Sequence, residues 1–214
     1  MSEYHKIQTV YKRDPATKHK TLSMGAYSMP EFEYLANNTW SFTEKVDGTN
    51  IRVYIKDGEV RFGGKTDNAQ IPTHLSKALD ELFTPKHDAL LENFKDADVC
   101  LYGEGYGAKI QKGGGLYRQD QGFVLFDIRI GEWWLKREDI EEIAGGLGID
   151  IVPVIGYGTL DEMIDMARNG FDSRWGKFAA EGIVARPTVE LKTRAGKRII
   201  TKIKGKDFPV HADK

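Results

Sequence analysis

Lys45 lies near the end of a short alternating segment, and its position suits a nucleophile. The segment 41–56 reads S-F-T-E-K-V-D-G-T-N-I-R-V-Y-I-K. Apolar residues alternate on both sides of Asp47-Gly48, which predicts two strands joined at a glycine that accepts backbone angles closed to branched residues. A lysine attacks once its ammonium has lost a proton, which nearby cations and partial desolvation favour. Lysines at strand ends are also common solvated residues, and from this segment alone that interpretation is the better one.

Two carboxylates stand beside glycine next to apolar segments. Glu104 follows the run V-C-L-Y within G-E-G, and Glu181 precedes G-I-V. A glutamate at the start of a strand can present its carboxylate to a metal-bound phosphate, which is the chemistry that Glu181 suggests. Taken alone, Glu104 has the sequence context of an ordinary turn carboxylate.

The segment 191–206 is strongly basic and contains no acidic residue. A turn is predicted at Ala195-Gly196, followed by a strand over 198–204 in which Lys202 and Lys204 share one face. Two ammonium groups on one face could bind a triphosphate. The formal net charge of the chain is −1, so a polyanionic partner must be bound by a local patch, and this segment is the clearest candidate.

The order of these segments resembles that of the covalent nucleotidyltransferases, the superfamily of ATP-dependent DNA and RNA ligases and capping enzymes. E-K-V-D-G-T-N is most similar to motif I of the RNA ligases of the phage repair type. Lys65 stands where that family usually has an arginine. The guanidinium of arginine is a planar fork of donors, whereas the ammonium of lysine is a point charge. The matching segments in chain order are E-K-V-D-G-T-N at 44–50 (motif I), Lys65, G-E at 103–104 (motif III), F-D-I at 126–128 (motif IIIa), E-G-I-V at 181–184 (motif IV) and K-I-K at 202–204 (motif V).

The resemblance implies a catalytic role for three lysines. Lys45 would attack the α-phosphate of ATP and carry AMP as a phosphoramidate, while Lys202 and Lys204 would stabilise the developing charge. Glu104 would hold the ribose and Phe126 would stack on the purine. The implied nucleotide-binding residues are Glu44, Asn50, Lys65, Glu104, Phe126, Glu181, Lys202 and Lys204, and the implied ligands of Mg²⁺ or Mn²⁺ are Glu181 and Asp127.

The function that the resemblance implies is ATP-dependent joining of 5′-phosphate and 3′-hydroxyl ends, with RNA, free or in a nicked duplex with DNA, as the partner. Two alternatives stay open: a minimal ATP-dependent DNA nick ligase, and a nucleotide-binding module without catalysis. Motif V ends ten residues before the last residue, which predicts that no oligonucleotide-binding barrel is appended. The polynucleotide must then be bound by the domain itself or by a separate polynucleotide-binding protein.

Hairpins with interspersed helices must position these residues. The predicted class is α+β: an antiparallel-sheet nucleotidyltransferase (adenylation) domain of the ATP-grasp-like DNA/RNA ligase type, as a single domain over 1–214. Asp57-Gly58 predicts a two-residue hairpin turn, and 109–117 a mobile loop. Helices are predicted over 71–83, 85–94, 136–147 and 159–169, and a strand over 151–155.

Composition limits the remaining classes. The chain has 214 residues, 40% of them hydrophobic, and a single cysteine, Cys100, which excludes an internal disulfide. The scattered histidines lack the spacing of a structural zinc site, and no apolar run reaches the length of a membrane span. We expect a monomeric cytoplasmic protein without a membrane partner, with a phage genome as one source.

Overall fold

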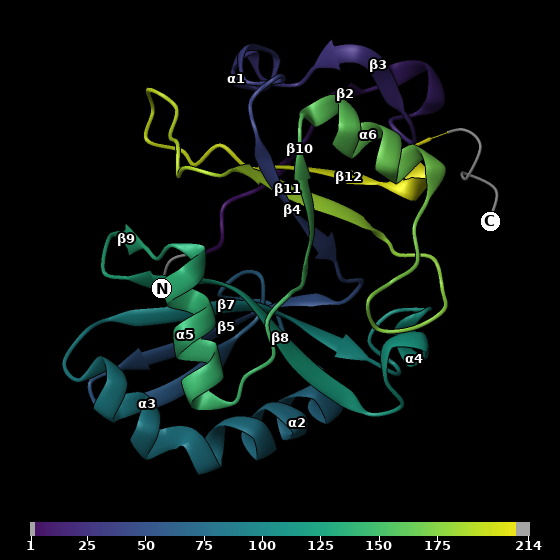
Figure 1. Cartoon of the computed structure of the whole chain (residues 1–214). Helices are drawn as coiled ribbons and strands as arrows, with labels where there is room; N and C mark the ends of the chain where they lie inside the picture. The colour runs from purple at the N-terminus through teal and green to yellow at the C-terminus, as the bar shows by residue number, and fades with distance from the viewer. Residues whose placement is uncertain (1–2, 209–214) are drawn as a thin grey trace. The chain divides into compact units, whose positions relative to one another are not determined.

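The computed structural model describes residues 3–208, which divide into two compact units (Figure 1). The first unit contains Asp47–Val152 and the N-terminal residues up to His5. The second unit contains Lys6–Val46 and the chain from Pro153 onward. Each unit has one five-stranded sheet and its own hydrophobic core, and the second unit also has a two-stranded sheet.

The sheet of the first unit is antiparallel, with the order β6-β5-β7-β8-β9. Its strands are β5 (Thr49–Lys56), β6 (Glu59–Gly63), β7 (Val99–Gly107), β8 (Gln121–Ile130) and β9 (Trp133–Trp134). The other elements are α2 (Thr73–Phe83), η2 (Thr84–Lys86), α3 (His87–Phe94), α4 (Gly114–Tyr117) and α5 (Arg137–Leu147).

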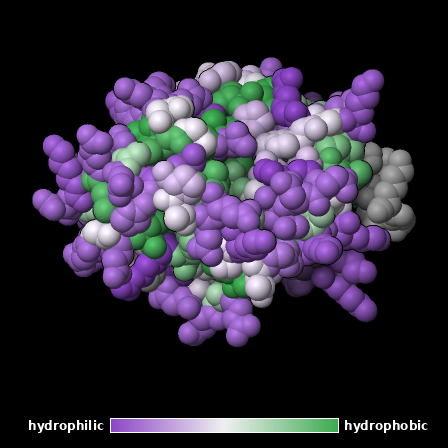
Figure 2. Space-filling view, turned by 90° about the horizontal axis from the view of Figure 1, so that it is seen from below, coloured by the Kyte–Doolittle hydropathy of each residue, from purple (hydrophilic) through white to green (hydrophobic). Residues whose placement is uncertain are grey.

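Strand alternation separates the two faces of this sheet. Ile51, Val53 and Leu101 face the core, where they pack with residues of α2, α3 and α5. Asn50 and Glu104, one residue away from core positions, therefore point to the opposite face. The solvent side of the helices carries charged residues, and the surface seen from below is mostly hydrophilic with small apolar patches (Figure 2).

The main sheet of the second unit has the order β1-β12-β11-β4-β10. Its strands are β1 (Gln8–Thr9), β4 (Trp40–Lys45), β10 (Val154–Gly158), β11 (Gly182–Pro187) and β12 (Thr201–Lys204), and only β1 with β12 is a parallel pair. The two-stranded sheet is formed by β2 (Tyr11–Arg13) and β3 (Leu22–Tyr27). The helices are η1 (Pro15–Thr17), α1 (Pro30–Tyr34), α6 (Leu160–Asn169) and η3 (Gly205–Asp207).

The core of the second unit lies between its main sheet and α6. Trp40, Phe42 and Ile183 are at most 3% exposed and pack with Met163 of that helix. Thr159 caps α6 with a reciprocal pair of hydrogen bonds to Glu162, which explains why the helix starts at this point.

The predicted α+β class with antiparallel sheets is confirmed, and the four predicted helices are present with small changes at their ends. α2 begins at Thr73 with Pro72 as its N-cap, and 84–86 forms a separate 3₁₀ turn before α3. Two strand predictions were partly wrong. The last strand begins at Thr201, not at residue 198, and the strand predicted over 151–155 is β10, Val154–Gly158.

The predicted turn at Asp57-Gly58 is confirmed, since both residues have positive φ values, 51° and 76°. The explanation given for Gly48 was wrong, because its φ is not positive. A Cβ at Gly48 would lie 2.3 Å from the Gly105 carbonyl oxygen, so the glycine is required by close backbone packing. The 109–117 segment, predicted as a loop, contains α4 and donates a hydrogen bond from Gln111 to the Gly48 carbonyl (3.0 Å).

No helix within residues 3–208 is long and apolar enough to cross a membrane. The single domain over 1–214 and the absence of an appended barrel stay predictions.

Candidate active site

Lys45, Glu181 and Lys204 form a charged cluster in the second unit. The Glu181 carboxylate forms ion pairs with both lysines. Its Oε2 lies 2.7 Å from Nζ of Lys45, and its Oε1 lies 2.5 Å from Nζ of Lys204. The side chain of Glu181 is 10% exposed, and those of the two lysines are 20% and 21% exposed. The cluster is therefore partly desolvated, and one carboxylate serves two cations.

The sheet register produces this cluster. β11 lies between β4 and β12, and Gly182 is directly opposite both Lys45 and Lys204. Residues directly opposite one another point to the same face, so the two lysines project on the same side of the sheet. Gly182 has no side chain between them, and a Cβ there would lie 2.2 Å from the Ile203 carbonyl oxygen. Glu181, one residue earlier, can therefore reach both ammonium groups.

Lys202 occupies the same face of β12 as Lys204. It is opposite Val184, two positions along the strand, while Thr201 and Ile203 are buried on the other face. The alternation predicted for the K-I-K segment is confirmed. Three lysines thus project from one face of the sheet at or near the end where β4 and β12 finish.

Glu44 lies on the opposite face from Lys45, as strand alternation predicts. Its carboxylate is 1% exposed and accepts hydrogen bonds from Ser173 Oγ (2.6 Å) and from the backbone N–H of Arg174 (2.8 Å). Burial raises the pKa of Glu44, and these hydrogen bonds oppose the shift. The structure shows Glu44 holding the segment that leads to Glu181, and its predicted contact with the nucleotide stays a prediction.

Asn50 and Glu104 are the predicted residues that the first unit brings together. They are directly opposite on β5 and β7, on the face away from the helices. Asn50 Oδ1 is buried and accepts no hydrogen bond from the residues described. An unpaired buried acceptor costs about 1–3 kcal/mol, so this atom is suited to a ligand that donates a hydrogen bond.

Close packing of glycines fixes Glu104. A Cβ at Gly103 would lie 2.2 Å from the Phe123 ring, and one at Gly105 would lie 2.6 Å from Leu75. Both glycines face the core, which lets these larger side chains fill the space beneath β7. Glu104 is therefore held within a strand and not in a turn, which corrects the turn context read from the sequence.

Phe126 lies at an irregularity of β8. The register pairs Asp127 with Tyr102 and Leu125 with Gly103, so Phe126 is the extra residue of a bulge. Its ring packs edge-on against that of Tyr4, with centroids 5.0 Å apart.

Asp127 is fully buried, and Tyr4 donates a hydrogen bond from its hydroxyl to Asp127 Oδ2 at 2.7 Å. Nothing in the sequence indicated that Tyr4 would contact motif IIIa. The role of Asp127 as a metal ligand stays a prediction.

Lys65 is exposed on the loop after β6. A buried arginine that sequence analysis missed holds this loop: Arg52 donates to the Gly64 carbonyl (2.7 Å) and pairs with Asp67 (3.0 Å). The signal was an arginine within the apolar run of β5, on the face that Asn50 shares.

The described carboxylates can meet the needs of a divalent cation only with help from other oxygen ligands. Between residues 3 and 208 no group of three or more His, Cys, Asp or Glu side chains is placed to hold a metal by itself. Mg²⁺ that is bound mainly by phosphate oxygens and water needs only one or two carboxylates. Glu181 fits that requirement, since it is partly exposed at the lysine cluster.

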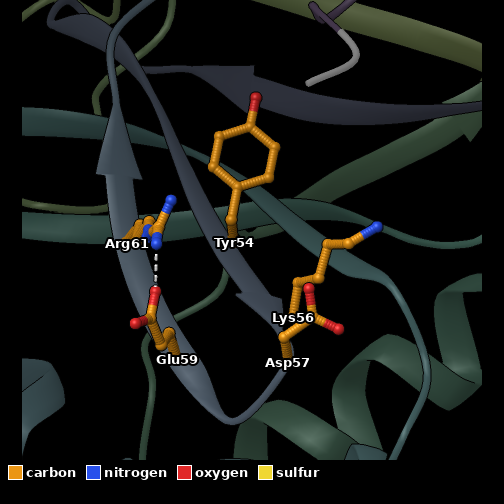
Figure 3. Close-up of a pocket in the computed structure, with 5 residues that line it drawn as sticks. All are labelled: Tyr54, Lys56, Asp57, Glu59 and Arg61. Carbon is orange, nitrogen blue, oxygen red and sulfur yellow. Dashed lines mark hydrogen bonds and ion pairs between the residues drawn. The ribbon is translucent and has the colours of Figure 1, made fainter.

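A separate pocket lies at the β5–β6 hairpin (Figure 3). Its lining residues are Tyr54, Lys56, Asp57, Glu59 and Arg61, none of which was predicted as a site residue. The lining contains two cations and two acids, and Arg61 pairs with Glu59. The balance of charge gives no preference for a phosphate.

Solved structures show the same fold. The Naegleria gruberi RNA ligase with pyrophosphate matches with a TM-score of 0.70 and 20% identity, over 100% of this chain and 59% of that one. A variant of that ligase with ATP and manganese matches with a TM-score of 0.65 and 20% identity, over 86% and 54% of the two chains. A variant with AMP and manganese gives 0.67 and 18%, over 95% and 56%.

This chain thus spans little more than half the length of these solved relatives. A comparison with curated protein sequences gives no match. The family model described as RNA ligase matches residues 38–204, which include Lys45, Glu104, Glu181 and Lys204. Because that match covers most of the sequence, the chain belongs to the RNA ligase family.

Proposed function

We propose that the chain is an ATP-dependent RNA ligase that joins 5′-phosphate and 3′-hydroxyl ends through AMP bound covalently to Lys45. The observation that carries this proposal is the pairing of Lys45 and Lys204 with one carboxylate, Glu181, at the ends of adjacent strands. A nucleophilic lysine beside a second cation and an acid is the arrangement that attack on a phosphate requires.

The residues of the second unit account for the first chemical step. Glu181 holds the Lys45 side chain in position. Once its ammonium has lost a proton to solvent, the Lys45 amine attacks the α-phosphate, and the P–N bond forms as the bond to pyrophosphate breaks. Lys202 and Lys204 neutralise charge on the phosphates from the same sheet face. A bound Mg²⁺ would supply further neutralisation of the phosphate charge, with Glu181 as its protein ligand. AMP is then transferred from Lys45 to the 5′-phosphate of RNA. A 3′-hydroxyl attacks that phosphate, which joins the two ends and releases AMP.

The residues of the first unit account for recognition of the nucleoside. Glu104 and Asn50 are adjacent on one sheet face and offer oxygen acceptors for ribose hydroxyls. Phe126 offers a ring for stacking on adenine, and Lys65 a cation for phosphate. These assignments rest on the motif resemblance and on the buried Oδ1 of Asn50.

We further propose the fold type as the ATP-grasp-like adenylation domain of the DNA/RNA ligases, and a monomeric, cytoplasmic protein. The solved relative with ATP and manganese supports ATP and a divalent metal ion as the cofactors, and the family supports RNA as the partner.

Covalent labelling with α-³²P-ATP tests this function directly. The unmodified chain should retain label after denaturation, and Lys45→Ala should abolish it. Lys56→Ala, which removes an exposed lysine at the end of β5, is the matched control and should label normally. Label that persists in Lys45→Ala, or reversible ATP binding without any adduct, would contradict the proposal. Sealing of nicked duplexes with RNA or DNA at the 3′-hydroxyl side then separates an RNA ligase from a DNA nick ligase.

A further inference from the structure

The chain between α6 and β11 forms a hairpin, which we call the 171–180 hairpin. The backbone N–H of Ala180 donates a hydrogen bond to the Phe171 carbonyl (2.9 Å), and the backbone N–H of Ser173 donates one to the Phe178 carbonyl (2.8 Å). Asp172 and Ala179 form a β-bridge between these two bonds. A turn closed by the Gly176 N–H and the Ser173 carbonyl (3.3 Å) completes the tip. The backbone of this segment is therefore internally fixed.

Glu44 attaches the hairpin to the strand that carries the nucleophile. Its buried carboxylate binds the Ser173 hydroxyl and the Arg174 N–H, while Ser173 Oγ also accepts from Trp175 N (3.1 Å). Glu44 is adjacent to Lys45, and the hairpin continues directly into Glu181. The tip is thus connected at both ends to the residues of the lysine cluster.

The charged side chains of the tip, residues 174–177, are both cationic, whereas the exposed Asp172 lies nearer the base of the hairpin. Arg174 and Lys177 are exposed, and neither forms an ion pair with another described residue. Trp175 and Phe178 are half-buried and alternate with them along the chain. Cations interleaved with aromatic rings are typical of surfaces that bind a nucleic acid strand through its backbone.

The segment 191–206, the basic patch expected from the sequence, is divided by the fold. Its turn at 193–197 precedes β12, whereas Lys204 ends β12 beside Gly182. β11 is six residues long, so its two ends are separated by roughly 17 Å at about 3.3 Å per residue. β11 ends at Pro187, opposite Trp40 and thus at the end of the strand pair remote from Lys45. The chain that follows, part of the yellow loop in Figure 1, contains the exposed Lys192 and Arg194.

We propose that the tip of the 171–180 hairpin, through Arg174 and Lys177, binds the phosphodiester backbone of the RNA strand on which Lys45 acts. This inference rests on the proposed function and assigns its strand-binding surface. Glu44 acts as a positioning residue that fixes the hairpin to β4, the strand whose last residue is Lys45. The turn at 193–197 serves as the comparison surface, since it has the same kind of exposed charge at the other end of the sheet.

Binding of a 5′-phosphorylated single-stranded RNA, measured by fluorescence anisotropy over a series of KCl concentrations, tests the proposal. The double variant Arg174→Ala/Lys177→Ala should bind more weakly, and the slope of log K against log salt should shrink by about 1.4, at about 0.7 per phosphate contact on a single strand. Lys192→Ala/Arg194→Ala removes two exposed cations from the same unit and is the matched control. It should keep the slope of the unmodified chain.

Equal slopes for the two double variants, or a larger loss in the control, would overturn the proposal. Binding is measured without ATP, so a chain that fails to label Lys45 would contradict the proposed function while this comparison still gives its answer. Labelling of Arg174→Ala/Lys177→Ala adds a second criterion. Loss of label as large as the loss of sealing would place the hairpin in the ATP step and overturn its assignment to the RNA strand.

Discussion

The Nζ atom of Lys45 lies 2.7 Å from Oε2 of Glu181, although 136 positions separate the two residues in the chain. The contact exists because β4 and β11 pair with Lys45 opposite Gly182. The proposed nucleophile is thus oriented before substrate binds, and such orientation lowers the entropic part of a reaction barrier. Since Glu181 also pairs with Lys204, loss of the acid would leave two cations close together.

Glu181→Gln should lower the rate of lysyl-AMP formation by at least tenfold, which corresponds to about 1.4 kcal/mol of barrier. The amide keeps the shape of the side chain but lacks the charge that offsets two ammonium groups. Affinity for ATP should change little, and higher Mg²⁺ should restore part of the rate. Single-turnover labelling over a range of ATP and Mg²⁺ concentrations measures both. Glu190→Gln, at an acid that pairs with Arg198, is the control, and equal rates in the two variants would contradict the role of Glu181.

Gly48→Ala should destabilise the first unit by about 1–3 kcal/mol, because the new Cβ would lie 2.3 Å from the Gly105 carbonyl oxygen and 2.8 Å from Glu104 Cγ. The displaced Glu104 should also weaken ATP binding. Urea unfolding measures the first effect and ATP titration the second. Gly145→Ala in α5 meets no atom within 4 Å and should be neutral or stabilising, by up to about 1 kcal/mol. If both glycine variants behaved alike, close packing would not be the reason for Gly48.

Glu44→Gln should change how stability depends on pH. Burial raises the pKa of Glu44, so the folded chain binds this proton more tightly than the unfolded chain. The contribution of Glu44 to the free energy of unfolding therefore falls as the pH rises from the ordinary glutamate value, about 4.3, through the raised value. Unfolding in urea between about pH 4 and pH 8 should show this fall in the unmodified chain and not in Glu44→Gln. Parallel curves would disprove it.

Tyr4→Phe should destabilise the first unit by about 1.5–3 kcal/mol, since it removes the hydroxyl that donates to the fully buried Asp127. The ring that packs against Phe126 remains. A double-mutant cycle with Asp127→Asn should show coupling of similar size. The same variants test whether Asp127 is a metal ligand: in that case only Asp127→Asn would raise the Mg²⁺ concentration needed for labelling. If the Mg²⁺ dependence is unchanged in both variants, Asp127 has a structural role.

The features of the site that depend on local strand geometry can be predicted from the sequence. Alternation in 41–45 placed Glu44 and Lys45 on opposite faces, and alternation in 201–204 placed Lys202 and Lys204 together, because strand geometry alone decides both. The pairing of β11 between β4 and β12 joins segments far apart in the chain, so the sharing of Glu181 by two lysines could not be read from spacing.

The site residues that could not be predicted from the sequence also depend on contacts between distant segments. Ser173, Arg52 and Tyr4 act through contacts made across loops and strands, and none belongs to a recognisable motif. The sequence correctly indicated that Gly48 must be a glycine, but the reason inferred from it was wrong. The close approach of Gly48 to the Gly105 carbonyl joins two segments that are distant in the chain, and no local pattern indicates it.

The main sheet of the second unit joins segments from distant parts of the chain. β1 and β12, the first and the last strands within residues 3–208, are neighbours in this sheet, whereas the first unit is built almost entirely from Asp47–Val152. Contacts between distant segments close slowly, and chains fold as they emerge from the N-terminus. On the ribosome the first unit can thus be complete while Lys45 still lacks its acid partner. The ion pair of Lys45 with Glu181 can therefore form only after synthesis has reached β11, and the pair of Glu181 with Lys204 only after it has reached the end of β12.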